Sequence, residues 1–118
     1  MGMDLYVKRI VGWEPEEDPY VAQTAPLSPI TEDVDWWDRQ RLVGRRDFVA
    51  FVSAGDYGEI VYEEPGMWGY CWSRLKYHEA CREWVREQRE MAEGNAEQLM
   101  RLINESEKDD QIVFRASW

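Results

Sequence analysis

The sequence predicts the α+β class, with a small antiparallel or mixed sheet of about three to four strands packed against about three helices. The first observation is the stretch at residues 72–91, in which apolar side chains recur at steps of three and four, the period of a helix that faces a core. The second is a set of shorter segments rich in β-branched and aromatic residues, which are typical of strands. The third is the length, because 118 residues with 44% hydrophobic side chains suit a single domain with one core.

The first strand is expected at residues 4–11, where Leu5, Val7 and Val11 share one face. A proline-rich acidic loop is expected at about residues 12–30, because this stretch holds four of the five prolines, which disfavour helices and central strands. Loops of this length in small domains are usually functional or disordered. Four large side chains are expected to anchor the loop to the rest of the domain: Trp13, Tyr20, Val21 and Leu27.

A helix is expected to begin at Thr31, whose hydroxyl can cap the first turn. Asp33 and Asp35 would then lie at the positive end of the helix dipole, where acidic side chains are favourable. Arg39 and Arg41 would fall toward the opposite end, so the charge pattern supports the same assignment.

The segment that follows is open to two interpretations. Residues 47–53 fit either a continued helix or a strand, and we favour the strand because its apolar run is continuous. The sequence GDYG then indicates a turn, and residues 58–63 a partner strand, so that the two strands form a hairpin that ends at Pro65.

The longest helix is expected at about residues 73–93, with Ser73 as its cap and Gly94 at its end. A shorter helix is expected at about residues 95–106, where leucine and isoleucine form one apolar side. The chain closes with a strand at residues 111–116. We place this strand beside the first one, because the chain ends of small α+β domains often pair.

Charge is the strongest global feature of the sequence. The 24 acidic and 14 basic side chains give a formal net charge of −10, which repels phosphate backbones and anionic membrane surfaces. Direct binding to nucleic acid or to a membrane is therefore not expected, and a partner with a basic surface is favoured. Two interpretations stay open: the acids maintain solubility, or they are grouped to meet such a surface.

Two clusters of acids are the candidate partner-binding sites. One lies in the proline-rich loop, and the other surrounds a pair of tryptophans, which are typical anchors of protein interfaces. The same aromatic side chains could instead fill the core or line a pocket for a small ligand. The candidate partner-binding residues are Glu14, Glu16, Glu17, Asp18, Asp33, Asp35, Trp36, Trp37 and Asp38.

Cys71, His78 and Cys81 would share one stripe of the predicted long helix, and thiolate with imidazole is a ligand set that suits zinc. Side chains on an apolar stripe more often simply pack, and three positions along one helix rarely align for nucleophilic catalysis. We therefore expect no metal, no cofactor and no catalytic residue. The two cysteines, about 15 Å apart on a helix, cannot form a disulfide, and with no signal peptide or long apolar run the protein is expected in the cytoplasm.

The chain has a DLY start at residues 4–6, a tryptophan pair followed by basic residues at 36–41, and an aromatic-rich SW ending at 114–118. These three short motifs resemble those of a group of small uncharacterised bacteriophage proteins. The group has no established activity. The resemblance implies a phage-encoded protein in the cytoplasm of a host cell, where small acidic phage proteins often bind and disable host machinery. The residues that carry it are Asp4, Leu5, Tyr6, Trp36, Trp37, Arg39, Arg41, Phe114, Ser117 and Trp118.

The expected function is that of a small acidic phage protein that binds and inhibits a host protein. One form of this function is a nucleic-acid mimic, such as an anti-CRISPR protein, that occludes a basic groove of a defence complex with carboxylates in the places of phosphates. A first alternative is a small-molecule-binding protein that uses the aromatic cluster and the proline-rich loop as a lid. A second alternative is an enzyme. The partner's identity and the oligomeric state stay open.

Overall fold

A computed structural model of the chain describes residues 4–37, 54–63, 71–88, 91 and 93–117. The elements within these residues are β1 (Asp4–Pro15), α1 (Pro19–Ala22), β2 (Leu27–Asp33), α3 (Ala54–Tyr57), β3 (Gly58–Glu63), β4 (Cys71–Leu75), α4 (His78–Glu87), α5 (Glu93–Lys108) and β5 (Ile112–Ser117).

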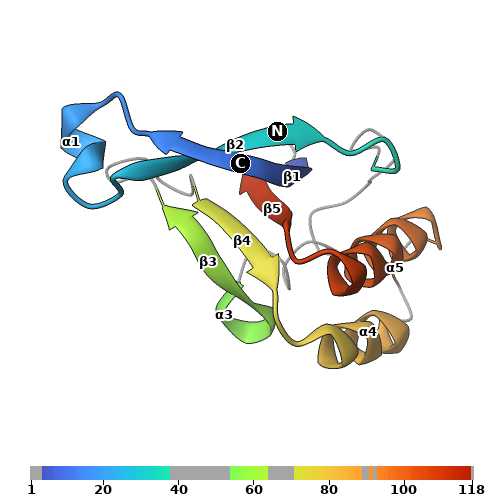
Figure 1. The fold of residues 1–118 in the computed structure, drawn as a ribbon. Helices are drawn as coiled ribbons and strands as arrows, with labels where there is room; N and C mark the ends of the chain where they lie inside the picture. Colours follow the sequence, from blue (N-terminus) through green and yellow to red (C-terminus); the bar gives the residue numbers. More distant parts are fainter. Residues whose placement is uncertain (1–3, 38–53, 64–70, 89–90, 92, 118) are drawn as a thin grey trace.

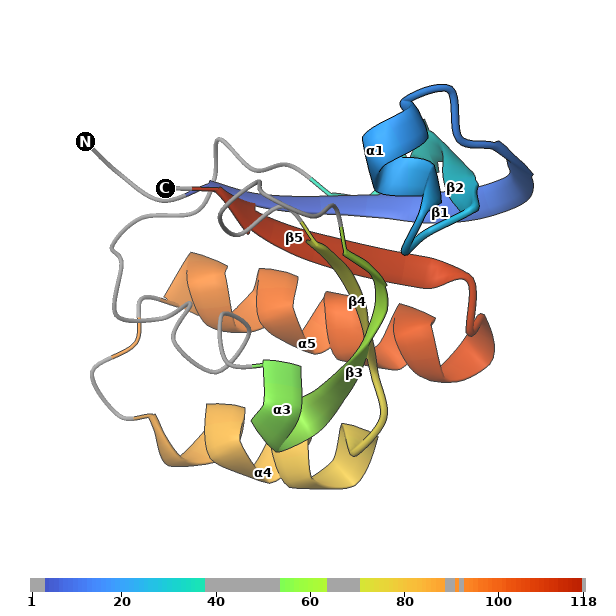
Figure 2. The same ribbon diagram turned by 90° about the vertical axis from the view of Figure 1, so that its left-hand side faces the viewer.

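The described strands form one antiparallel sheet in the order β2-β1-β5-β4-β3. Figures 1 and 2 show α4 and α5 side by side on one face of this sheet, whereas α1 lies on the other face, at the end of the long β1–β2 hairpin. The predicted α+β class is confirmed. Over the described residues the sheet is antiparallel and has five strands, more than the three to four expected.

The centre of the sheet is the pair of chain ends, as predicted. β5 lies antiparallel to β1, with Leu5 opposite Ala116 and Val7 opposite Phe114. These four side chains face the helices, because alternate residues of a strand point to the same side. The pairing of the two strands was expected because the chain ends of small α+β domains often pair, and it is confirmed.

The loop predicted at residues 12–30 is wrong for most of its length. β1 continues to Pro15, and the chain returns as β2, with Trp13 opposite Pro29. The prolines allow this because β2 is at the edge of the described sheet, where one side of the strand needs no ladder hydrogen bonds. Pro19 opens α1, a position at which the missing N–H costs nothing.

The first strand also carries an irregularity that the alternation of residues 4–11 did not predict. The register shifts between Ile10, which lies opposite Thr31, and Gly12, which lies opposite Ile30. Val11 is therefore an extra residue, as in a β-bulge, and 47% of it is exposed. Its predicted place on the same face as Leu5 and Val7 is wrong.

The helix predicted to begin at Thr31 is wrong over the described residues, since Thr31 belongs to β2. Asp33 ends this strand opposite Lys8 rather than lying at a helix N-terminus. A capping residue followed by acids is a local signal, and pairing with β1 outweighs it. The continuation of this predicted helix beyond Trp37, and the predicted strand at residues 47–53, lie outside the described residues.

The strand predicted at residues 58–63 is confirmed as β3, but its described partner is β4. The turn predicted at GDYG is a single helical turn, α3. β4 occupies the first part of the predicted helix 73–93, which is wrong there. Trp72, Ser73 and Leu75 are all buried, because β4 lies inside the sheet and both of its faces are covered.

The residues of the predicted helix 73–93 are therefore divided mainly between β4 and α4. α4 begins only at His78 and spans ten residues, and its N-cap Tyr77 makes no side-chain capping bond, so the predicted cap at Ser73 is wrong. α5 has 16 residues and is the longest described helix; it confirms the helix predicted at residues 95–106. Gly94 lies within α5 and not at the end of the preceding helix.

The main core lies between the sheet and the two longer helices. α5 contributes Leu99, Leu102 and Ile103, which are fully buried, and α4 contributes Cys81 and Val85. The strands contribute the side chains that point toward the helices: Leu5, Val7, Leu75, Ile112 and Phe114.

A second, smaller apolar cluster covers the face of the sheet that α4 and α5 leave uncovered. Its buried members are Ile10, Tyr62, Trp72 and Val113, with Ala25 packed against them from the segment after α1. The central strands thus carry buried apolar side chains on both faces. The second face is where the described cavities open.

Candidate functional site

Acidic charge is concentrated in the N-terminal part of the chain. We call residues 4–37, which comprise β1, α1, β2 and the turn after β2, the β1–β2 ribbon. It holds eight acidic and two basic side chains, so less than a third of the chain carries six of the ten net negative charges. The excess of acids is a regional property, not one spread evenly over the surface.

The structure separates the two acidic clusters predicted as binding sites. Glu14 lies opposite Ser28, near the start of β2, whereas Asp33 ends β2 opposite Lys8. Six residues of β1 separate the two positions, which is about 20 Å at about 3.3 Å per residue. The clusters lie at opposite ends of one edge and do not form a single patch.

Within residues 14–18, two acids have contacts inside the molecule. Glu16 is half-buried and accepts hydrogen bonds from the Tyr62 hydroxyl at 3.1 Å and from the Asp18 N–H at 3.2 Å. Asp18 accepts from the Tyr20 N–H at 2.9 Å and so caps α1. Glu14 and Glu17 are exposed, which leaves them best placed to meet a partner.

The second cluster surrounds two tryptophans that pack inside the molecule. Trp36 and Trp37 are half-buried against the main core, with their rings edge to face at 6.4 Å. The Trp37 Nε1–H donates to the Leu5 carbonyl at 2.9 Å, and the Arg101 guanidinium lies 5.8 Å from the centre of the Trp36 ring.

The acids beside these tryptophans are less uniform than the sequence suggested. Asp33 pairs with Lys8 at 3.4 Å while 87% of its side chain stays exposed, and Asp35 is exposed. Asp38 lies outside the described residues. Partner binding by this cluster stays a prediction.

Exposed aromatic residues occur elsewhere, at the far end of the ribbon. Trp13, Tyr20 and Leu27 are 43%, 65% and 50% exposed, so the prediction that they anchor a loop is wrong. Only Val21 is buried as expected. We define the ribbon tip as the exposed acids and large apolar residues at this end: Trp13, Glu14, Glu17, Asp18, Tyr20 and Leu27.

Beside the ribbon tip an apolar pocket of about 760 Å³ opens between the start of β2 and β3. Trp13 and Leu27 form its wall on the ribbon side, and Val61 and Tyr62 form its wall on β3. Its other lining residues are Thr24, Ala25, Pro26 and Glu63. The volume lies in the range of small-molecule sites.

A smaller cavity of about 280 Å³ shares Tyr62 with that pocket and is polar. Every strand of the described sheet contributes to its lining. The residues are Lys8 from β1, Glu16 after β1, Ser28, Pro29 and Thr31 from β2, Tyr62 from β3, Trp72 from β4 and Arg115 from β5.

Sequence reasoning did not find this polar cavity. The only local signal is that Lys8 and Arg115 are charged residues within apolar strands. Their meeting depends on the strand order, since β5 must lie beside β1 for the two side chains to share a face. No spacing in the sequence contains that information.

The cysteines and the histidine do not share a helix. Cys71 is in β4, whereas His78 and Cys81 are in α4, so the single stripe predicted for the three is wrong. Cys81 is fully buried, and burial raises the pKa of its thiol to about 12, which keeps it protonated and unreactive. Among the described residues, no three or more His, Cys, Asp or Glu side chains are grouped as a metal site.

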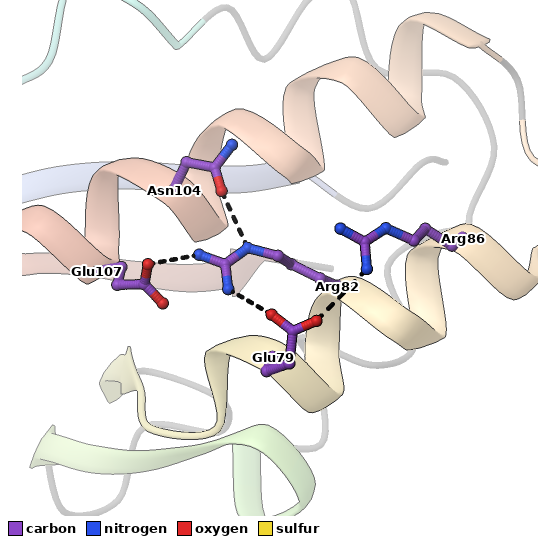
Figure 3. Close-up of polar contacts among 5 residues, drawn as sticks. All are labelled: Glu79, Arg82, Arg86, Asn104 and Glu107. Atoms are coloured by element: carbon purple, nitrogen blue, oxygen red, sulfur yellow. Dashed lines mark hydrogen bonds and ion pairs between the residues drawn. The ribbon is translucent and has the colours of Figure 1, made fainter.

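Two acids of the helices, Glu79 and Glu107, are engaged in contacts between α4 and α5 (Figure 3). Arg82 pairs with Glu79 of its own helix at 2.9 Å and with Glu107 of α5 at 2.8 Å, and its Nε–H donates to Asn104 at 3.0 Å. The hydrogen bond from Arg82 lowers the pKa of the Glu107 carboxyl. These charges stabilise a helix pair, which distinguishes them from the acids of the ribbon tip.

No known protein-family model, curated protein or solved structure matches this chain. None of the helices in the described part of the chain has both the length and the apolar character needed to span a membrane.

Proposed function

We propose that this protein acts by binding a partner protein that presents a basic and partly apolar surface, and that the ribbon tip makes the contact. The observation that carries the proposal is the combination found there. Exposed carboxylates of Glu14 and Glu17 lie beside exposed Trp13, Tyr20 and Leu27. Large aromatic residues supply affinity in protein interfaces, whereas complementary charges supply association rate and specificity.

The proposal has a more specific form, which follows from the resemblance to phage proteins. In this form the protein is encoded by a bacteriophage and inhibits a host protein by covering its nucleic-acid-binding groove. The support is the charge of the ribbon. Its two acidic ends are about 20 Å apart, which is comparable with the length of about six nucleotides of one DNA strand. Carboxylates at both ends would then take the places of phosphates.

The test begins with capture of a partner from host lysate and continues with the purified pair. Wild-type affinity should fall as ionic strength rises, because salt screens the attraction between the two surfaces. The double variant Glu14→Lys/Glu17→Lys should bind at least about tenfold more weakly, mainly through slower association. The matched control is Glu83→Lys/Glu97→Lys, which makes the same charge change at exposed helical positions and should leave the affinity within about twofold.

Tyr20→Ala should mainly speed dissociation, because Tyr20 is 65% exposed and would be buried only in the complex. Affinity that is the same at low and high salt, and equal for the two double variants, would contradict the proposal. The specific form is tested by competition: duplex DNA or RNA should displace the protein from its partner. Simultaneous binding of both would exclude mimicry and leave protein binding standing.

Small-molecule binding is the second candidate function. The observation that favours it is the pair of cavities on the face of the sheet opposite α4 and α5, which share Tyr62.

A further inference from the structure

The polar cavity has a fixed cationic side. The Arg115 guanidinium lies between two aromatic rings, 5.0 Å from the centre of Tyr6 and 4.8 Å from that of Trp72. Such contacts hold a guanidinium in place while its donors, which lie in the plane of the group, point along its edges. Lys8 lies on the neighbouring strand and lines the same cavity. The Lys8 ammonium also pairs with the exposed Asp33 carboxylate at 3.4 Å. Two cationic side chains thus line one region of the cavity.

The cavity also has a fixed carboxylate. Glu16 reaches it from the segment after β1, and its two oxygens are held by the Tyr62 hydroxyl and the Asp18 N–H. Hydroxyl groups of Ser28 and Thr31 complete the polar lining. A site with cations and a carboxylate in a volume of about 280 Å³ matches a small group that carries both charges.

The neighbouring pocket supplies a different environment. It shares Tyr62 with the polar cavity but is walled by Trp13, Leu27 and Val61. A ligand that occupied both would need a polar, charged head and an apolar body. Burial of that body would supply most of the affinity, and the head would fix its orientation.

We propose that the two cavities together bind a zwitterionic α-amino acid with a large apolar side chain. Its carboxylate faces Arg115 and Lys8, its ammonium group faces Glu16, and its side chain lies against Trp13. A zwitterion fits better than a simple anion, because an anion would approach against the net charge of −10. This site does not depend on partner binding by the acids of the ribbon tip.

The first test uses wild-type protein and isothermal titration calorimetry with L-phenylalanine and L-leucine as probes. We expect saturable binding to one site per chain. N-acetyl-L-phenylalanine, which lacks the ammonium group, and L-phenylalaninamide, which lacks the carboxylate, should each bind at least about tenfold more weakly, because each loses a charge-assisted contact. No binding of either amino acid at millimolar concentration, or a blocked derivative that binds as tightly as L-phenylalanine, would overturn the proposal.

The second test assigns the orientation. Arg115→Gln should weaken binding of L-phenylalanine at least about tenfold and remove the preference for the carboxylate over the amide. Glu16→Gln should instead remove the preference for the free ammonium over the N-acetyl form. A variant whose packing alone was disturbed would bind all probes more weakly by the same factor. A change in preference between probes therefore shows loss of a specific contact and not loss of the fold.

Matched controls are available close by. Glu17→Gln alters the adjacent exposed carboxylate, and Arg86→Gln alters an exposed arginine of α4; neither residue lines the cavities, and both variants should bind within about twofold of wild type. If both Arg115→Gln and Glu16→Gln kept the wild-type preferences for the free carboxylate and the free ammonium group, the proposed orientation of the ligand would be overturned. Glu14→Lys/Glu17→Lys should keep amino-acid binding even where it abolishes partner binding, so the two proposals can fail separately.

Discussion

Cys81 and Arg115 show how the surroundings of a side chain determine its chemistry in this protein. Cys81 lies in the main core among side chains of the sheet and α5, and burial alone disfavours its thiolate. Arg115 is also drawn into the fold, but between aromatic rings that favour a cation. Burial makes the Cys81 thiol inert, whereas the two rings beside Arg115 hold its guanidinium in place.

The thiol of Cys81 should resist alkylation as long as the protein is folded. With a pKa of about 12, almost none of it is thiolate at pH 8, and the thiolate is the reactive form. Iodoacetamide labelling followed by mass spectrometry should find Cys81 unmodified in native protein and fully modified after unfolding in guanidinium. Cys71, which is half-buried in β4, is the internal comparison. Native labelling of Cys81 as fast as in the unfolded chain would contradict its burial.

At the scale of elements, α4 is too short to be stable alone. Ten residues form fewer than three turns, and isolated helices of this length are marginal in water. Its attachment to the domain comes from the buried Cys81 and Val85 and from Arg82, which reaches across to α5. The side chain of Arg82 is only 12% exposed, although the carboxylates that it meets are largely open to solvent.

Arg82→Ala should therefore destabilise the protein by about 1 kcal/mol, a value reduced from that of a buried pair because water screens the carboxylates. Arg86→Ala should cost less than about 0.5 kcal/mol, because Arg86 is exposed and its one ion pair within the described residues is with Glu79, at 3.4 Å. The measurement is urea unfolding followed by circular dichroism. Equal losses for the two variants would mean that the bridge between the helices contributes nothing beyond a surface ion pair.

β2 shows how an edge strand is protected from pairing with other chains. Within the described sheet it has one neighbour, and it carries Pro29 and the charged Glu32 and Asp33. Proline and charge are two common ways to prevent edge-to-edge aggregation. Part of the acidity of the ribbon is explained by this local need, which is why the proposed binding surface rests on the exposed acids of the ribbon tip.

For the whole molecule, one ion pair joins distant parts of the chain. Arg9 of β1 donates to Asp109, in the turn between α5 and β5, at 2.7 Å. Burial by itself would raise the pKa of the Asp109 carboxyl, but the hydrogen bonds from Arg9 and from the Gln111 N–H hold it below its ordinary value of 3.8. The folded protein thus favours the ionised carboxylate more than the unfolded chain does.

This pair should make stability depend on pH in the acid range. A carboxyl whose pKa is lowered by folding stabilises the protein fully above its unfolded pKa of about 4, and that contribution is lost as pH falls through the folded value. The difference in unfolding free energy between wild type and Arg9→Gln should be largest near pH 7 and shrink below about pH 4. Urea titrations at several pH values measure it. The control is Lys76→Gln, at an exposed site, whose unfolding free energy should differ from that of wild type by a small amount that does not vary with pH. A difference for Arg9→Gln that stayed constant with pH would refute the linkage.

Local sequence was enough for the elements whose own pattern is unambiguous. The strands at residues 4–11, 58–63 and 111–116 and the helix at residues 95–106 were predicted because alternation or helical period decides them without reference to neighbours. Net charge and the grouping of acids also follow from the sequence, and they led to the binding hypothesis. Each of these properties depends on residues that are close in the chain.

The strand conformation of β2 and of β4 depends on tertiary contacts and could not be predicted from local sequence. Pro29 argues locally against a strand and Thr31 can cap a helix, but pairing with β1 outweighs both signals. Cys71–Leu75 continues a helical pattern, but burial on both faces of the sheet outweighs it. The polar cavity is the extreme example, since Lys8, Tyr62 and Arg115 come from three strands far apart in the sequence. Local signals act over a few residues, whereas a site built across a sheet exists only once the strand order is set.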